Sequence, residues 1–144
     1  MSDMTFRMLI LAVYLAFSLA QGATITVCPG GCDYSSIKAA VFAAAPGDVV
    51  EIQSGRYYDH LKIDKRIVLR GVDSRDGMPI LDATGSGSPV TISADGVVVE
   101  GLRLLNGGPE SAGILVLSDD STVRNNDASN NYIGIHLVGS RLRQ

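Results

Sequence analysis

Residues 94–107 read ADGVVVEGLRLLNG and residues 118–131 read SDDSTVRNNDASNN, and the second stretch repeats the pattern of the first at an offset of 24 residues. In this alignment Val99 meets Val123. A fixed period of about 20–50 residues is typical of solenoids, in which each repeat is one layer that buries its apolar face against the neighbouring layers. The repeat therefore predicts a fold of stacked layers.

The repeated columns contain residues that a coil needs at its corners. Gly71, Gly101 and Asn125 follow the strand-like runs IVLR, VVVE and STVR. Because glycine and asparagine tolerate a positive φ better than other residues, we expect a left-handed corner at all three positions. Asn106 and Asn130 share a further column, where we expect stacked amide side chains to form a hydrogen-bonded ladder inside the turn.

Side chains alternate between the two faces of a strand, and this alternation predicts which residues face outward. Arg70, Glu100 and Arg124 precede the corner residues and are expected to face solvent as weak cross-layer ion pairs, each worth at most about 1 kcal/mol. Residues 113–116 (GILV) and 134–137 (GIHL) form a second column at an offset of 21. Its isoleucines, valine and last leucine are expected inside the coil, and its histidine outside.

A short helix is predicted before the strands. Small apolar residues are spaced i, i+3, i+4 and i+7, which places them on one helix face; they are Ile37, Ala40, Val41 and Ala44. Asp33, Ser35 or Ser36 is available to cap the start of this helix, and Pro46-Gly47 ends it. Because repeat proteins cover their open ends with capping elements, we expect the helix to lie over the first layer.

From residue 49 onward the sequence consists of short, β-branched runs without helical periodicity. Such runs at a period near 24 residues predict an all-β parallel β-helix, in which every turn of the coil adds strands to the same sheets. Residues 23–48 then hold a first strand, a cysteine loop and the capping helix, and residues 49–144 hold about four layers. Without a visible C-terminal cap, residues 49–144 are interpreted as truncated, or as ending where another chain docks.

The first 22 residues have the features of a secretory signal peptide: Arg7, the apolar run MLILAVYLAFSLA and then small residues. An uncleaved anchor is the alternative, although the run is short for a membrane span of about 20 residues. We expect a secreted, periplasmic or cell-surface protein with no membrane span after removal of residues 1–22. The net charge of −3 argues against a nucleic-acid partner, because such a partner requires a basic face.

Both cysteines of the chain lie in the motif CPGGC, as Cys28 and Cys32. Export would place them in an oxidising compartment, so we predict a local structural disulfide. The alternatives are a redox pair, which usually spaces its cysteines by two residues, and a pair of metal thiolates, which would need further ligands nearby.

The sequence also resembles a known group of proteins. Residues 35–73 (SSIKAAVFAAAPGDVVEIQSGRYYDHLKIDKRIVLRGVD) resemble the N-terminal signature of secreted right-handed β-helix proteins. Residues 93–108 and 112–137 resemble the repeats of the NosD-like and carbohydrate-binding and sugar-hydrolase (pectate-lyase-like) group. This resemblance implies a right-handed parallel β-helix and export. Members of the group include polysaccharide lyases and hydrolases, the NosD copper-accessory protein and envelope proteins without an assigned activity.

An enzyme that acts on polysaccharide would need paired carboxylates, or a Ca²⁺ site and a basic residue. The candidate acids are Asp59, Asp64, Asp82, Asp95, Asp119, Asp120 and Asp127. Asp95 and Asp119 share an aligned position, but both lie in ordinary turn sequences, where aspartate hydrogen-bonds its own backbone. We therefore assign no catalytic residue.

A copper carrier would need histidine, methionine or cysteine ligands within reach of one another. His60 and His136 lie about three layers apart along the chain, and Met78 is isolated. We therefore assign no metal ligand and no cofactor.

The sequence thus predicts a non-catalytic β-helix module of the cell envelope or extracellular space, which contacts carbohydrate or another envelope protein. A relative or fragment of polysaccharide-active enzymes is the alternative, and a copper-accessory protein similar to NosD is a third. Tyr57, Tyr58 and Tyr132 are candidate platforms for stacking sugars. For Tyr57 and Tyr58 we favour packing in the turn after Gly55, whereas Tyr132 is expected to be exposed.

Overall fold

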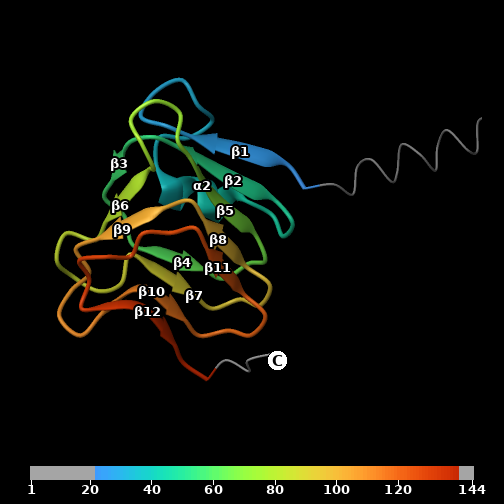
Figure 1. Cartoon of the computed structure of the whole chain (residues 1–144). Coiled ribbons are helices and arrows are strands. Elements are labelled where there is room, and N and C mark those ends of the chain that lie inside the picture. Colours follow the sequence, from blue (N-terminus) through green and yellow to red (C-terminus); the bar gives the residue numbers. More distant parts are fainter. Residues whose placement is uncertain (1–21, 140–144) are drawn as a thin grey trace, which may run out of the picture.

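The computed structural model describes residues 22–139, which coil into stacked layers of short strands (Figure 1). The predicted signal peptide lies outside the described residues except for Gly22. All pairings between the named strands are parallel, and a single short helix precedes the coil in this part of the chain. The predicted all-β parallel β-helix is confirmed.

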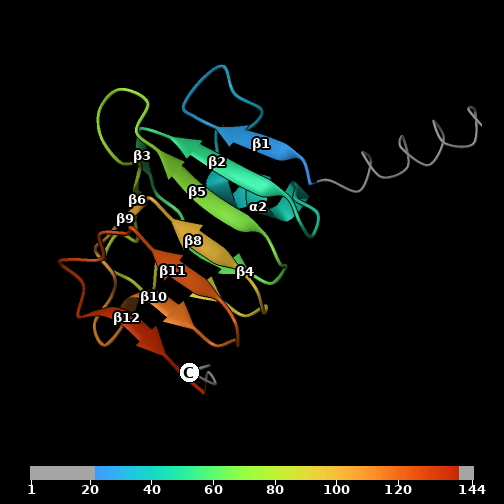
Figure 2. The same cartoon turned by 45° about the vertical axis from the view of Figure 1, so that its right-hand side comes forward.

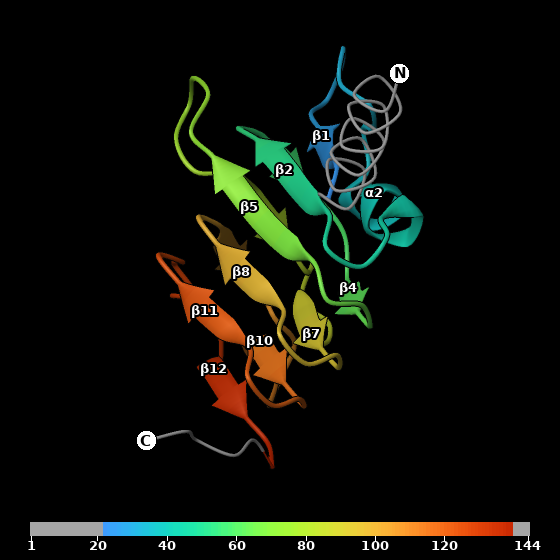
Figure 3. The ribbon, with the colours of Figure 1, turned by 90° about the vertical axis from the view of Figure 1, so that its right-hand side faces the viewer.

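Three sheets run along the coil, and Figures 2 and 3 show their strands stacked edge to edge. The first sheet contains β1 (Thr24–Val27), β2 (Val49–Gln53), β5 (Val68–Val72), β8 (Val98–Glu100) and β11 (Thr122–Arg124). The second contains β3 (Arg56–Tyr57), β6 (Ile80–Asp82) and β9 (Arg103–Leu105). The third contains β4 (Leu61–Ile63), β7 (Val90–Ile92), β10 (Ala112–Val116) and β12 (Ile133–Leu137).

Each turn of the chain visits the three sheets in order, so β2, β3 and β4 form one layer and the following strands form the next three. In the fourth layer an isolated bridge between Arg103 and Asp127 continues the second sheet. The register confirms both sequence columns, since Val99 pairs with Val123 and Leu115 pairs with His136. The predicted period is therefore the height of one layer.

The core fills the inside of the coil with aliphatic side chains from all three sheets. Val50, Leu69 and Val99 form one such column and are fully buried. In the last layer Ile135 and Leu137 are about half exposed, because no described residue packs over them. Each layer thus depends on its neighbours for burial of its apolar face.

The helix α2 (Ile37–Ala43) covers the first layer, as predicted, and contacts β1, β2 and β4. The side chain of Ser36 caps the helix by accepting a hydrogen bond from the N–H of Ala39. The helix buries Ile37, Ala40 and Val41 against the coil. A seven-residue helix is marginal on its own, so packing on the coil stabilises it.

The predicted left-handed corners occur at four of five positions. Gly101 (φ 74°), Asn125 (φ 54°), Asn106 (φ 56°) and Asn130 (φ 60°) all have positive φ. The expectation for Gly71 is wrong, because this residue lies within β5, paired with Ile52, and does not have a positive φ. Close approach of the next layer, rather than backbone conformation, requires a glycine there.

The predicted ladder between Asn106 and Asn130 does not form. The amide of Asn106 donates instead to Asp82 of the preceding layer, over 3.0 Å, and the side chain of Asn130 is exposed. Asn131 crosses to the preceding layer in its place: it accepts from the N–H of Gly107 (2.8 Å) and donates to the carbonyl of Leu104 (2.7 Å). The residue after the left-handed asparagine thus joins the layers.

Candidate functional site

The outer face of the first sheet carries an ion-pair ladder that crosses three layers. Glu100 accepts from Arg70 over 2.7 Å and from Arg124 over 2.6 Å. The hydrogen bond from Arg70, followed by that from Arg124, lowers the pKa of the Glu100 carboxyl below its ordinary value. These three side chains satisfy one another, so the ladder serves the stacking of β5, β8 and β11.

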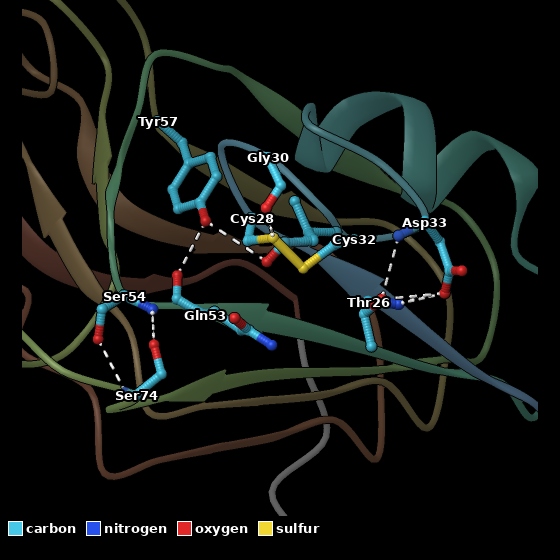
Figure 4. The surroundings of a disulfide bond; sticks show 10 residues. Thr26, Cys28, Gly30, Cys32, Asp33, Gln53, Ser54, Tyr57 and Ser74 are labelled. Carbon is cyan, nitrogen blue, oxygen red and sulfur yellow. Dashed lines mark hydrogen bonds between the residues drawn. A yellow bond between two sulfur atoms is a disulfide. The ribbon is translucent and has the colours of Figure 1, made fainter.

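Cys28 and Cys32 form a disulfide in the structure, with their Cα atoms 5.5 Å apart (Figure 4). Tyr57 lies beside this loop, and its hydroxyl donates to the carbonyl of Gln53 over 2.8 Å. Tyr57 is buried, and the carbonyl of Val27 lies 3.5 Å from the same hydroxyl. The disulfide and Tyr57 together hold the cysteine loop on the start of the coil.

A second polar cluster lies on the outside of the coil, where the second sheet turns toward the third. Its centre is Asp82, whose carboxylate is only 4% exposed. Arg56 donates to Oδ2 of this carboxylate from Nε (3.1 Å) and from a terminal nitrogen (2.5 Å). The other oxygen accepts from the N–H of Thr84 (2.8 Å) and from the amide of Asn106 (3.0 Å). Residues from three successive layers meet here.

Electrostatics keep this carboxylate charged. The hydrogen bond from Arg56 is the main reason that the pKa of Asp82 is lowered, with the Thr84 N–H and Asn106 adding to it against the opposing effect of burial. The same hydrogen bond raises the pKa of Arg56. Both groups therefore remain ionised near neutral pH and are held in one geometry.

Tyr58 borders this cluster and is 65% exposed. The guanidinium carbon of Arg56 lies 5.9 Å from the centre of its ring, which is within cation–π range. The expectation of a packing role is confirmed for Tyr57 but wrong for Tyr58. Strand alternation explains the difference, since consecutive residues point to opposite faces and only Tyr57 faces the core.

Tyr132 is exposed, as predicted, and has the same place in the fourth layer that Tyr58 has in the first. Tyr58 lies three residues before Leu61 of β4, and Tyr132 lies three residues before Ile135 of β12. The third sheet aligns Leu61 with Ile135 through Val90 and Ile114. The two tyrosines therefore mark the first and last layers along one corner of the coil.

The aligned aspartates behave as turn residues. The Asp95 carboxylate accepts from the backbone N–H of Asp119 over 2.9 Å and so links two turns. His60 and His136 are not brought together, because β7 and β10 separate their strands in the third sheet. Residues 22–139 contain no group of three or more His, Cys, Asp or Glu side chains placed to hold a metal ion, and no helix of theirs is long and apolar enough to span a membrane.

The structure also forms a groove that the sequence reasoning missed. It lies between α2 and β4, has a volume of about 320 Å³ and is lined by Lys38, Val41, Phe42, His60, Leu61, Lys62, Asp64 and Lys65. A signal was present in the sequence, because these three lysines are the only lysines of the chain. Their shared location became visible only when the helix was placed on the third sheet.

Comparison with known proteins adds evidence on the fold. No family model matches the chain, and no curated protein matches its sequence. Among solved structures, the crystal structure of the pectin methylesterase from Aspergillus niger matches with a TM-score of 0.66 at 17% identity. The match covers 84% of this chain and 48% of that one, so this chain spans about half of the enzyme's length. At this identity the likeness supports the parallel β-helix fold alone.

Proposed function

We propose that this protein is an exported, non-catalytic β-helix module that binds carbohydrate on the corner carrying Tyr58 and Tyr132. The fold is shared with an enzyme whose name states that it acts on pectin, which is a polysaccharide. Export is supported by the signal-like leader and by the disulfide, since disulfides persist in oxidising compartments.

The observation that carries the proposal is the contact between Tyr58 and the Arg56–Asp82–Asn106 cluster. A pyranose ring has an apolar C–H face that stacks on an aromatic ring, and hydroxyl groups that need hydrogen-bond partners. Tyr58 offers such a ring, and the half-exposed guanidinium of Arg56 offers donors beside it. Because Asp82 already fixes Arg56, little side-chain entropy is lost when a sugar binds.

Tyr132 supports a ligand of several linked sugars. Three layer spacings of about 4.8 Å separate the first and fourth layers, so the two tyrosines lie about 14 Å apart along the coil. Both are exposed, and Gly87 and Ser111 occupy the equivalent places in the layers between them. Small residues between two aromatic platforms leave room for an extended chain.

The state of Asp82 supports binding rather than catalysis. A general acid must hold a proton near neutral pH, which requires a raised pKa. The pKa of Asp82 is lowered by Arg56, so this carboxylate acts as a hydrogen-bond acceptor and an anchor for Arg56. The alternative, a polysaccharide-active enzyme, is tested by the same experiment.

The experiment is a screen of the purified protein on a glycan array, run beside an assay for released reducing sugar with and without Ca²⁺. We expect binding of at least one polysaccharide without release. Tyr58→Ala is expected to weaken binding at least tenfold, whereas Tyr58→Phe retains it because the ring is kept. Arg124→Gln, on the first sheet, is the control and should bind normally. Absence of binding, or unchanged binding by Tyr58→Ala, would overturn the proposal, and sugar release would overturn its non-catalytic part.

A further inference from the structure

All three lysines of the chain lie in the groove between α2 and β4. Lys38 comes from the helix, Lys62 from β4 and Lys65 from the turn after it. Asp64 is the only acidic residue among those that line the groove. A chain of net charge −3 thus concentrates positive charge at one place. The local field there favours an anionic ligand.

The lysines are not used as the arginines are. Within residues 22–139 all four ion pairs are formed by arginines, and no lysine takes part. Lys65 is engaged at the end of α2, where its ammonium donates to the carbonyls of Phe42 (2.7 Å) and Ala44 (2.6 Å). The exposed side chains of Lys38 and Lys62 carry the charge that a ligand would meet.

Phe42 gives the groove an aromatic wall. Its side chain is 87% exposed, which is unusual for a phenylalanine on a helix whose opposite face is buried. The Lys65 ammonium lies 5.9 Å from the ring centre, so a cation holds the ring beside the groove. An exposed ring next to ammonium groups suits a ligand that is both ring-shaped and negatively charged.

We infer that this groove binds an anionic sugar residue, whose ring stacks on Phe42 while its carboxylate or sulfate is bound by Lys38 and Lys62. The volume of about 320 Å³ is at the small end of ligand pockets and suits one sugar ring or two. The inference rests on the proposed function, since it names the class of sugar and places a charged end of the ligand at the first layer. His60, two residues after Tyr58, links this groove to the tyrosine corner.

The test compares binding of a polyuronate oligosaccharide, the same oligosaccharide after reduction of its carboxyl groups to alcohols, and a sulfated oligosaccharide, all at about 0.15 M salt. We expect at least one charged form to bind tenfold or more tighter than the neutral form. The Lys38→Gln/Lys62→Gln variant should abolish this difference and leave neutral binding unchanged. Phe42→Ala should weaken binding of the preferred charged form. Arg75→Gln removes one exposed positive charge elsewhere and should have no effect.

The outcomes separate the two proposals. Equal binding of charged and neutral forms, or a charge preference that survives in Lys38→Gln/Lys62→Gln, overturns the anionic-sugar inference and leaves the tyrosine corner intact. Failure of all forms and of the glycan array overturns both. Preference for the polyuronate over the sulfated form assigns a carboxylate, and the reverse assigns a sulfate. Because the substituted lysines are exposed and form no ion pair in the described residues, both variants are expected to fold.

Discussion

Gly71 in β5 and Gly101 after β8 face each other across two layers at contact distance. A Cβ atom on Gly71 would lie 2.1 Å from the carbonyl oxygen of Gly101, and one on Gly101 would lie 2.5 Å from that of Gly71. Both opposing atoms belong to the backbone, so neither moves without shifting a layer. The two glycines therefore fix how closely these layers stack at this corner.

Gly71→Ala should lower the free energy of unfolding by about 3 kcal/mol, because overpacking against backbone forces the layers apart. Gly30→Ala is the matched control, since no heavy atom lies within 4 Å of the added carbon. The control should change stability by no more than about 0.5 kcal/mol. Urea unfolding of both variants measures the difference, and equal stability would contradict the stacking explanation.

Asp82→Asn should destabilise the protein in a pH-dependent way. Because Arg56 lowers the folded-state pKa of Asp82, its contribution is complete above the unfolded pKa of about 3.9 and is lost as the pH falls through the folded pKa. At pH 7 the loss of the charged hydrogen bonds should cost about 1–3 kcal/mol. The gap between wild type and variant should narrow toward pH 2. Asp76→Asn, in an exposed loop, should follow the wild-type curve at all pH values.

Glu100→Gln should reveal a weaker and salt-sensitive contribution. Arg70 and Arg124 are about half exposed, so we expect the two pairs together to stabilise the fold by about 1 kcal/mol at low salt. At about 1 M NaCl the difference from wild type should shrink, because the Debye length falls to about 3 Å. Thermal unfolding at two salt concentrations measures it, with the exposed Glu110→Gln as the control. A difference that does not change with salt would argue against an ionic origin.

Asn131→Ala should cost about 2–3 kcal/mol, because the N–H of Gly107 and the carbonyl of Leu104 lose their partner between layers. Asn130→Gly is the appropriate comparison for the neighbouring position. Glycine accepts the φ of 60° without strain, so this substitution removes only the exposed side chain. It should leave stability nearly unchanged by guanidinium unfolding, and a larger loss at Asn130 than at Asn131 would reverse the assignment of the bridging residue.

Sequence reasoning failed at Gly71, the asparagine ladder and Tyr58 for one physical reason. Each of these residues is defined by what lies in an adjacent layer, and the distance along the chain between layers is not constant. Arg70 and Glu100 lie 30 residues apart, whereas Glu100 and Arg124 lie 24 apart, although both pairs connect adjacent layers. A period read from one pair of repeats therefore does not give the neighbours in another.

The amino-acid sequence by itself determined the parallel β-helix, its capping helix and the alternation of buried and exposed side chains. These features follow from local requirements: aliphatic residues inside each strand, glycine or asparagine at left-handed corners and a capped amphipathic turn. Only the tertiary structure decided which residues meet. Arg56, Asp82 and Asn106 come from three layers, and the three lysines come from a helix and a sheet that packing brings together. Loops of unequal length set these contacts, and their length has no local signature.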